Sequence, residues 1–422
     1  MFSASQFPVL YLFAKKLDYC QISVFLREKR LKLLMLAALL LIGTPGQAAY
    51  FNFPENLPAG CSGSNGKYTC GTLALHAGDT VFIAPGLVVT VTINGDFTAD
   101  AGVAINSTGT ANGLNILVIG VTSIGADSVI NGNITSMGTG STINIGDRSK
   151  ISGSLITENS AINLGNRVSI IGSLSTMVTG VITVGAYSSV SGGLTTRTGA
   201  INVGANSTNG ALVSISAGAV TTGASSVVNG QISTGAGAVT TGANSKVTGN
   251  VTTSVGAVTI GVGGTVGGKI NNFDTSTAGA VTVGDGGVIT GAILTGAGAV
   301  TLGVNAQAAG IATKDGAITI DSLNSVRGSA CTGNSGAITV GSNSKVGGNV
   351  ITKTAGAITI GAYAIVGGVA VAKGAGDVSL GTGSMVGTIE SSLHCADVIA
   401  TSLKLPALLT IRSREWRQLF MR

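Results

Sequence analysis

The stretch Gly256-Ala257-Val258-Thr259-Ile260-Gly261 decides the fold, because close variants of it recur along most of the 422 residues. Its general form is Gly-Ala-(Val/Ile)-Thr-(aliphatic)-Gly, and we call its last position the anchor. Fourteen anchors follow one another at a mean spacing of 19.7 residues. They are Gly125, Gly146, Gly165, Gly185, Gly204, Gly223, Gly242, Gly261, Gly284, Gly303, Asp321, Gly341, Gly361 and Gly381. Repeats of this length indicate a solenoid, in which each unit forms one coil.

A second glycine stands seven residues after the anchor in 12 of the 14 units. Only Ala211 and Thr388 break this rule, and the distance from this second position to the next anchor varies between 11 and 16 residues. One part of each unit therefore has a fixed geometry, while insertions collect in the other part, as in loops at one corner of a coil. We expect the glycines to supply positive φ angles where the chain turns tightly.

Apolar and polar residues alternate around the anchor. Three residues before it, 13 of 14 units have Val or Ile, and one residue before it, 12 of 14 have Ile, Val or Leu. The residue between these columns is always Thr, Asn or Ser. The positions five and nine residues after the anchor are also apolar, apart from Asn209 and Glu390. Alternation with a period of two indicates half-buried strands, so each unit is expected to form two short strands.

A single unit cannot bury its own apolar side chains, so successive units must stack. Stacking pairs each strand with the coils above and below it at about 4.8 Å per coil. No proline occurs between Val121 and Glu390, as expected where interior strands donate hydrogen bonds to a ladder. The sequence therefore predicts an all-β fold, a right-handed parallel β-helix of about 14 or more coils with an N-terminal cap.

Four parts are predicted along the chain. They are an N-terminal extension and signal peptide (1–48), an N-terminal cap and first coils (49–120), the β-helix repeats (121–390) and a C-terminal tail or cap (391–422). A basic run at 27–32, ten apolar residues at 33–42 and the small residues Gly46 and Ala48 predict export with cleavage after Ala48. Ten apolar residues are too few for a membrane span, which needs about 20. A membrane anchor or a buried helix is the alternative interpretation of this segment.

Five cysteines are distributed unevenly along the chain. Cys61 and Cys70 are nine residues apart in a Gly/Ser-rich loop, which a disulfide can close in an oxidising compartment. Cys20 would be removed on export. Cys331 and Cys395 are assigned no partner.

Basic residues concentrate at the two ends of the chain. The formal net charge is +6, but residues 50–396 contain 12 basic and 13 acidic residues. The body therefore has no basic surface for phosphates, and nucleic acid is not an expected partner.

Catalytic β-helices need clustered carboxylates with Arg, Lys or His beside a groove. Residues 121–390 contain nine acids and no histidine. Asp274, Asp285 and Lys269 lie in or beside the longest coil, Gly268–Gly284, and are the best candidate cluster. We interpret them as solvated loop charges. With no Cys/His metal motif either, the chain is expected to be no enzyme and to hold no cofactor or metal.

A flat strip of small side chains is the candidate binding face. Ala stands four residues before the anchor in 10 of 14 units, two residues from the Thr/Asn/Ser column. The strip includes Ala219 with Thr221, Ala238 with Thr240, Ala257 with Thr259 and Ala299 with Thr301. Such a strip can pack against a partner, a second copy or the ordered water of ice. The alternative is that Thr simply suits exposed strand positions.

The chain resembles the amino-terminal region of proteins of mannose-sensitive haemagglutinin pilus biogenesis. The resemblance covers roughly residues 50–390 and rests on Phe53-Pro54-Glu55-Asn56-Leu57-Pro58, Cys61 with Cys70, Val91 to Phe97, and repeat segments such as Asn131 to Thr135. It implies a β-helix linked to pili. The repeats also resemble bactofilins, cytoplasmic β-helices that polymerise end to end, and this implies self-assembly.

These observations predict an exported, non-catalytic structural or surface protein, linked to pilus biogenesis or adhesion. The expected location is the periplasm, the outer-membrane surface or the extracellular space, without a membrane span in the mature chain. Expected partners are copies of itself or components of the cell surface or pilus. The alternatives are a self-assembling bactofilin-like polymer and binding of ice or another surface through the Ala-x-Thr strip.

Overall fold

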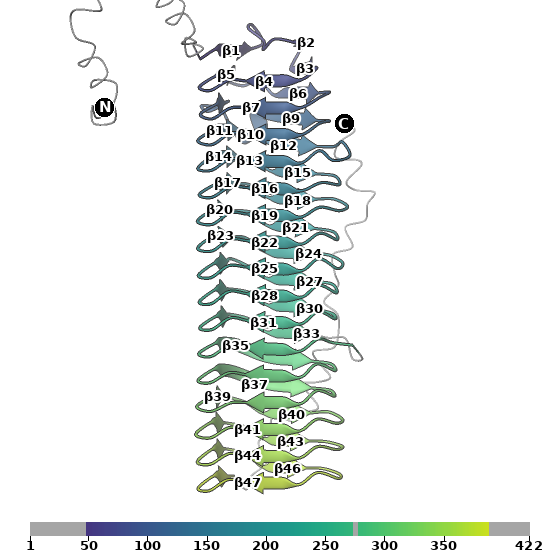
Figure 1. Ribbon diagram of the computed structural model, residues 1–422, viewed down its shortest axis with the longest axis vertical. Helices are drawn as coiled ribbons and strands as arrows, with labels where there is room; N and C mark the ends of the chain where they lie inside the picture. The colour runs from purple at the N-terminus through teal and green to yellow at the C-terminus, as the bar shows by residue number, and fades with distance from the viewer. Residues whose placement is uncertain (1–47, 273–276, 388–422) are drawn as a thin grey trace, which may run out of the picture. The chain divides into compact units, whose positions relative to one another are not determined.

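The computed structural model describes residues 48–272 and 277–387. The predicted signal peptide and the tail 391–422 lie outside these residues. The described chain consists of short strands, with one 3-10 turn, η1 (Ala111–Gly113). Sixteen coils stack as a parallel β-solenoid, which confirms the predicted parallel β-helix of 14 or more coils (Figure 1).

Each coil contributes strands to three faces. We number the faces in chain order, starting with the face that ends at the anchor. The first face, which ends at the anchor, is β4 (Leu73–Leu75), β7 (Phe97–Ala99), β10 (Thr122–Ile124), β13 (Ile143–Ile145), β16 (Ile162–Leu164), β19 (Ile182–Val184), β22 (Ile201–Val203), β25 (Val220–Thr222), β28 (Val239–Thr241), β31 (Val258–Ile260), β34 (Val281–Val283), β36 (Val300–Leu302), β38 (Ile318–Ile320), β41 (Ile338–Val340), β44 (Ile358–Ile360) and β47 (Val378–Leu380). The second face is β1 (Tyr50–Phe53), β5 (Thr80–Ile83), β8 (Ala104–Ile105), β11 (Val129–Asn131), β14 (Lys150–Ser152), β17 (Ser169–Ile171), β20 (Ser189–Val190), β23 (Thr208–Asn209), β26 (Val227–Val228), β29 (Lys246–Val247), β32 (Thr265–Val266), β35 (Val288–Thr295), β37 (Gln307–Thr313), β39 (Ser325–Val326), β42 (Lys345–Val346), β45 (Ile365–Val366) and β48 (Met385–Val386). The third face is β2 (Cys61–Ser64), β3 (Lys67–Cys70), β6 (Val89–Ile93), β9 (Leu114–Val118), β12 (Asn133–Ser136), β15 (Leu155–Thr157), β18 (Leu174–Thr176), β21 (Leu194–Thr196), β24 (Leu212–Ser214), β27 (Ile232–Thr234), β30 (Val251–Thr253), β33 (Ile270–Asn272), β40 (Ala330–Thr332), β43 (Val350–Thr352) and β46 (Ala370–Ala372), and β35 and β37 continue into it.

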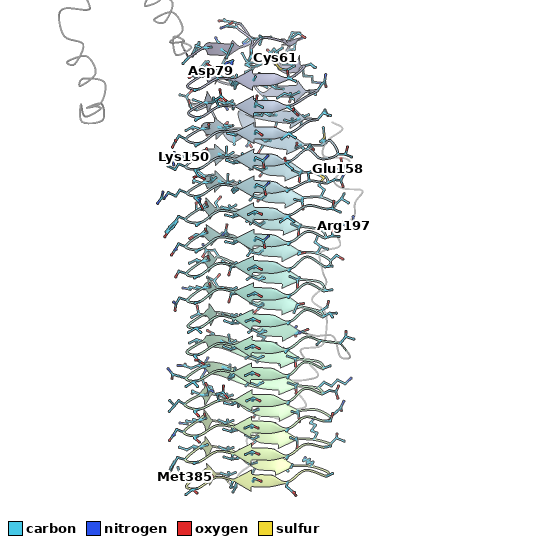
Figure 2. All side chains as sticks on the ribbon, viewed as in Figure 1. Cys61, Asp79, Lys150, Glu158, Arg197 and Met385 are labelled. Atoms are coloured by element: carbon cyan, nitrogen blue, oxygen red, sulfur yellow. A yellow bond between two sulfur atoms is a disulfide. The ribbon has the colours of Figure 1, made fainter. Side chains whose placement is uncertain are left out.

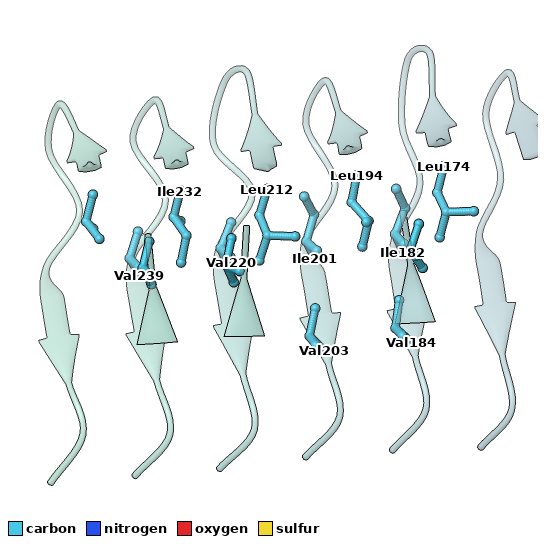
Figure 3. Packing of buried hydrophobic residues seen from close by; sticks show 14 of the residues in the cluster. Leu174, Ile182, Val184, Leu194, Ile201, Val203, Leu212, Val220, Ile232 and Val239 are labelled. Atoms are coloured by element: carbon cyan, nitrogen blue, oxygen red, sulfur yellow. The ribbon is translucent and has the colours of Figure 1, made fainter. Parts of the chain in front are cut away.

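The core is a set of aliphatic columns that run along the solenoid. Figure 3 shows two of them, in which like residues of successive coils lie over one another. One column contains Leu174, Leu194, Leu212 and Ile232, and the other contains Ile182, Ile201, Val220 and Val239. All of these side chains are fully buried. Because every coil places its apolar residues at the same points of the cross-section, the interior is continuous from coil to coil.

The prediction of two strands per unit was wrong for most coils, which have three. The second predicted strand breaks at the second glycine and gives one strand on each of two faces, as in β17 and β18 around Gly172. A Cβ at Gly172 would lie 2.2 Å from the carbonyl oxygen of Gly153 in the preceding coil. Only β35 and β37 run through this corner as single strands.

Glycines supply positive φ at some of the corners, as expected, for example at Gly153, Gly263 and Gly286, but the anchor glycines do not. None of them adopts a positive φ. At Gly185, for example, a Cβ would lie 2.3 Å from the carbonyl oxygen of Gly165, the preceding anchor. At the thirteen glycine anchors the backbones of successive coils therefore approach too closely for a side chain, and Asp321 is the one anchor that carries one. The positive φ falls two residues later, mostly on non-glycine residues such as Tyr187 and Asn206.

Hydroxyl groups inside the corners bond to backbone carbonyls. Ser188 and Ser207 donate to the anchor carbonyls of Gly165 and Gly185 in their preceding coils, at 3.1 and 3.0 Å. At the corner after the third face, Thr196 donates to the carbonyl of Gly199 at 2.6 Å. These buried serines and threonines were missed by the sequence analysis, although their recurrence at fixed distances from glycine was a usable signal. They satisfy carbonyls that the turns leave without strand partners.

Two units are one residue shorter between their second and third faces. Their inward residues on the third face are Leu212 and Ile311, which pair with Leu194 and Ala330. The column nine residues after the anchor therefore points outward in these two units, contrary to the prediction. A shift of one residue moves a side chain to the opposite face of a strand.

An antiparallel hairpin lies at the start of the described solenoid. The hairpin consists of β2 and β3, and β3 also pairs in parallel with β6 of the next coil. The rings of Phe53 and Tyr68 pack edge to face beside it, with centroids 4.8 Å apart. The role of residues 49–120 as a cap stays a prediction.

Candidate functional site

A column of eight threonines runs along the outside of the first face. We call this column, with the alanines beside it, the threonine face. Its threonines are Thr221, Thr240, Thr259, Thr282, Thr301, Thr319, Thr339 and Thr359, each directly opposite the next in the strand register. In β28 the residues on either side of Thr240 are buried, so its own side chain points outward. The hydroxyl groups therefore repeat once per coil, at about 4.8 Å.

A parallel column of alanines lies beside the threonines. The carbonyls of these alanines extend the ladder: Val220 donates to Ala238 at 2.9 Å, and Val239 donates to Ala257 at 2.8 Å. The alanines are Ala219, Ala238, Ala257, Ala280, Ala299, Ala317, Ala337 and Ala357. Neither column contains a charged residue over these eight coils. The result is a regular surface of methyl groups and hydroxyls on a parallel sheet.

All eight residues singled out in the sequence lie on the threonine face. Six of them are exposed, and Ala219 and Thr301 are half-buried. Beyond these four named pairs, the face also contains Ala280 with Thr282 in its middle and the three coils that extend it to Thr359. The face is thus twice as long as the predicted set.

The threonine hydroxyls differ from those of the buried threonines in their hydrogen bonding. Within the described residues, none of the eight threonine hydroxyls forms a hydrogen bond with another protein group. Buried Thr234, in contrast, donates to the carbonyl of Gly237 at 2.5 Å. The hydrogen-bonding capacity of the face is therefore directed at whatever lies outside the molecule.

The first face is more polar and slightly hollowed toward its N-terminal end. Here the outward column contains Ser123, Asn144 and Asn163, and the Asn163 amide donates to the Asn144 side chain at 2.9 Å. With Thr98 and Asp100 these residues line a shallow depression over β7, β10, β13 and β16. The threonine repeat is thus confined to the C-terminal part of the first face.

Charged side chains lie at corners, as Glu158 and Arg197 illustrate, or on the second face, as Lys150 illustrates (Figure 2). Both guanidinium contacts of Arg148 with the Asp127 carboxylate measure 2.7 Å. This hydrogen bonding lowers the pKa of Asp127 and raises the pKa of Arg148. Both groups are solvent-exposed, so the pair adds little to stability.

The candidate catalytic cluster is not assembled in the described residues. Asp274 lies outside them. Lys269 precedes β33, whereas Asp285 follows β34 at the anchor corner and accepts a hydrogen bond from the backbone N–H of Val304 at 2.8 Å. Asp285 thus has a structural contact at a different corner from Lys269. Among residues 48–272 and 277–387, no group of three or more His, Cys, Asp or Glu side chains has an arrangement for a metal ion.

The described cysteines all take part in disulfides. Cys61 and Cys70 face each other in the hairpin and are bonded, with their Cα atoms 4.0 Å apart. Cys331 is also disulfide-bonded, although the sequence analysis gave it no partner. Its side chain points out of β40 and is nevertheless 1% exposed.

The fold defines the chain as a parallel β-solenoid protein. No protein-family model, curated protein or solved structure matches it. Within the described part, no helix is both long and apolar enough to cross a membrane. The resemblances to pilus-biogenesis proteins and to bactofilins stay predictions.

Proposed function

We propose that this chain is an exported, non-catalytic structural protein of the cell surface or periplasm, and that it binds an extended partner through the threonine face. The observation that carries the proposal is the register of eight exposed threonines in consecutive coils. A partner with its own repeat along one direction, such as a pilus fibre or a surface polymer, meets the same chemistry at every coil.

The composition of the face supports binding by shape and many weak contacts. Alanine methyls and threonine methyls can be buried without the cost of desolvating a charge. The unbonded hydroxyls then supply directional hydrogen bonds at a fixed interval. Because the side chains are short, little conformational entropy is lost when a partner covers them. Many modest contacts acting together give avidity without a deep pocket.

The predicted signal segment supports the location. A basic run followed by ten apolar residues and a small-residue cleavage site is typical of secreted precursors. The Cys61–Cys70 disulfide is consistent with an oxidising compartment outside the cytoplasm. Linkage to pili or adhesion follows from the resemblance described above and is part of the proposal.

A charge-insertion experiment tests the face. Thr259→Lys combined with Thr282→Lys places two ammonium groups at its centre, and Thr265→Lys on the second face is the matched control. Lys is tolerated there, because Lys246 occupies the paired position in the preceding coil. Cells that produce the wild type, the double variant or the control are fractionated. The amount of each protein that sediments with the cell surface or pili is then measured.

We expect wild type and T265K to be recovered with the surface fraction, and the double variant to be released while keeping its β-sheet circular dichroism. Unchanged surface binding of the double variant would refute binding through the threonine face. Recovery of the mature protein in the cytoplasm would refute the proposed location. Thermal hysteresis in dilute solution would instead identify ordered water as the ligand, in place of a surface partner.

End-to-end polymerisation is the second candidate, and the last described coil favours it. Two inward side chains of this coil are exposed: Val378 by 39% and Leu380 by 58%. Within the described residues β47 pairs only with β44, and β48 only with β45, so each has an unpaired edge. Such an edge is a template for another chain. A monodisperse monomer in sedimentation velocity at high concentration would exclude this candidate.

A further inference from the structure

We infer that cleavage of the precursor after Ala48 creates an ion pair at the N-terminal end of the solenoid, in which the new α-ammonium group of Ala49 binds the buried carboxylate of Asp79. The ion pair fixes the start of β1 to the next coil. The inference rests on the export that the proposed function includes, because export brings the cleavage. It adds to that function a step in which processing of the chain stabilises its folded form.

The backbone nitrogen of Ala49 lies beside the Asp79 carboxylate. It donates a hydrogen bond to Oδ1 of Asp79 at 2.7 Å, and the Ala49 carbonyl accepts one from the backbone N–H of Thr80 at 2.9 Å. Ala48 is exposed, whereas Ala49 is half-buried. The predicted cleavage therefore separates an exposed residue from a residue that two hydrogen bonds hold in the solenoid.

Hydrolysis of the bond between Ala48 and Ala49 changes the charge of this nitrogen. Water adds across the bond, so that its hydroxyl group completes a carboxyl group on Ala48 and its other hydrogen goes to the nitrogen of Ala49. The amine that forms takes up a proton near neutral pH and becomes an ammonium group with three N–H donors. One donor keeps the contact with Asp79, and the others reach water because Ala49 is only half-buried. With both partners charged, Coulomb attraction adds to the hydrogen bond.

The Asp79 carboxylate is buried without a strong cationic partner among the described residues. It is 2% exposed, and its Oδ2 accepts a hydrogen bond from the backbone N–H of His76 at 2.7 Å. No described Lys or Arg forms an ion pair with it. The ring nitrogen Nδ1 of His76 is 3.9 Å away and that side chain is 83% exposed, so solvent weakens the contact. Burying a carboxylate without a positive partner is costly, and the α-ammonium group of Ala49 supplies the partner.

The same corner position is uncharged in every later coil that the structure describes. Asp79 directly precedes β5, and the residues that directly precede the fifteen later strands of the second face are Val, Ser, Gly, Ala or Asn. Serines there make the corresponding contact. Ser188 accepts a hydrogen bond from the backbone N–H of Val168 at 3.0 Å, and Ser207 accepts one from that of Ser188 at 3.2 Å. A hydroxyl group is thus sufficient for a backbone N–H, and the carboxylate occurs where the donor is the nitrogen that cleavage turns into a cation.

Sequencing of the mature amino terminus tests the cleavage. The protein is purified from the surface or periplasmic fraction, and Edman degradation identifies its first residues. The expected sequence is Ala-Tyr-Phe-Asn-Phe, residues 49–53. Any other first residue in the exported protein would refute the ion pair while leaving the proposed function intact. Unprocessed protein in the cytoplasm would refute the proposed location as well.

A double-mutant cycle tests the ion pair. Insertion of one glycine between Ala48 and Ala49 moves the ammonium group one residue away and leaves Ala49 with a backbone N–H. Asp79→Asn removes the carboxylate charge with little change of shape. Hydrogen exchange of β1 is measured by mass spectrometry in the processed wild type, the two single variants and the combined variant. The insertion should accelerate exchange about tenfold when Asp79 is present, because a neutral donor replaces a charged one. In D79N it should change exchange by less than about twofold.

Asp96→Asn is the matched control, because Asp96 also accepts a backbone N–H, that of Val121 at 2.8 Å, from a residue inside the chain. The insertion should accelerate exchange of β1 in D96N as much as in the wild type. Exchange in β38 and β41 should be equal in all of these proteins, which shows that the solenoid is folded in each. An insertion effect of the same size in the wild type and in D79N would show that Asp79 only accepts a backbone hydrogen bond, and it would overturn the inference.

Discussion

Asn209 lies in register between Val190 of the preceding coil and Val228 of the next one, so an amide occupies a column that is otherwise aliphatic. The side chain is 1% exposed, and neither its nitrogen nor its oxygen has a hydrogen-bond partner. A buried polar group without partners costs about 1–3 kcal/mol.

Asn209→Val is therefore expected to stabilise the protein by about 1–3 kcal/mol, because it removes the unsatisfied amide and restores the Val column. The shift of the urea midpoint measures the gain. Thr208→Val, one residue away and exposed, is the control and should change stability little. A lower midpoint for N209V would mean that the amide has a stabilising role.

The anchor glycines give a second prediction. Gly185→Ala places a methyl group 2.3 Å from the carbonyl oxygen of Gly165, and the two coils must move apart to accommodate it. Overpacking of this kind costs about 1–3 kcal/mol, so the thermal midpoint should fall. At Gly71 an added Cβ meets nothing within 4 Å, and Gly71→Ala should leave the midpoint nearly unchanged. Equal effects of the two variants would contradict the steric account of the anchors.

Most of the fold could be predicted because the inward columns repeat in every unit. Residues such as Ile201 and Val220 have apolar counterparts about 20 residues away, and a period of two assigns their direction within each strand. The threonine face could be predicted on the same basis, since Thr240 stands between two inward residues. Its partner could not, because short hydroxyl side chains suit many surfaces equally well.

The errors arose where spacing or corner geometry departs from the repeat. Val213 and Ala312 were assigned inward, but a unit shortened by one residue turns them outward. The corner two residues after the anchor was missed because its sequence varies: the positive φ is adopted by residues as different as Arg167 and Tyr187. Conformation there is imposed by the neighbouring coils, and local propensity does not reveal it.

The hairpin disulfide gives a third prediction. Replacing Cys61 and Cys70 together by Ala opens a loop of about ten residues, and the lost constraint on the unfolded chain costs about 2–3 kcal/mol. In a solenoid, stability is a sum of local terms, so the loss should be confined to the first coils. Hydrogen exchange should accelerate in β1, β3 and β6 and stay unchanged in β38 and β41. Faster exchange throughout would show that the hairpin controls the folding of the whole stack.

The fourth prediction concerns corner positions that require positive φ, and the chain offers a reciprocal pair. Leu323 and Asn343 occupy the same corner in neighbouring coils, with φ angles of 64° and 58°. Both side chains are exposed, so burial differs little between them. The left-handed conformation costs an ordinary L-residue about 1–2 kcal/mol, whereas Asn adopts it readily. Leu323→Asn should therefore raise the free energy of unfolding by about 1 kcal/mol, and Asn343→Leu should lower it by a similar amount. Urea unfolding of the two variants measures both changes, and the double variant should return to the wild-type midpoint. Shifts of the same sign would mean that side-chain contacts, and not backbone conformation, determine which residue suits this corner.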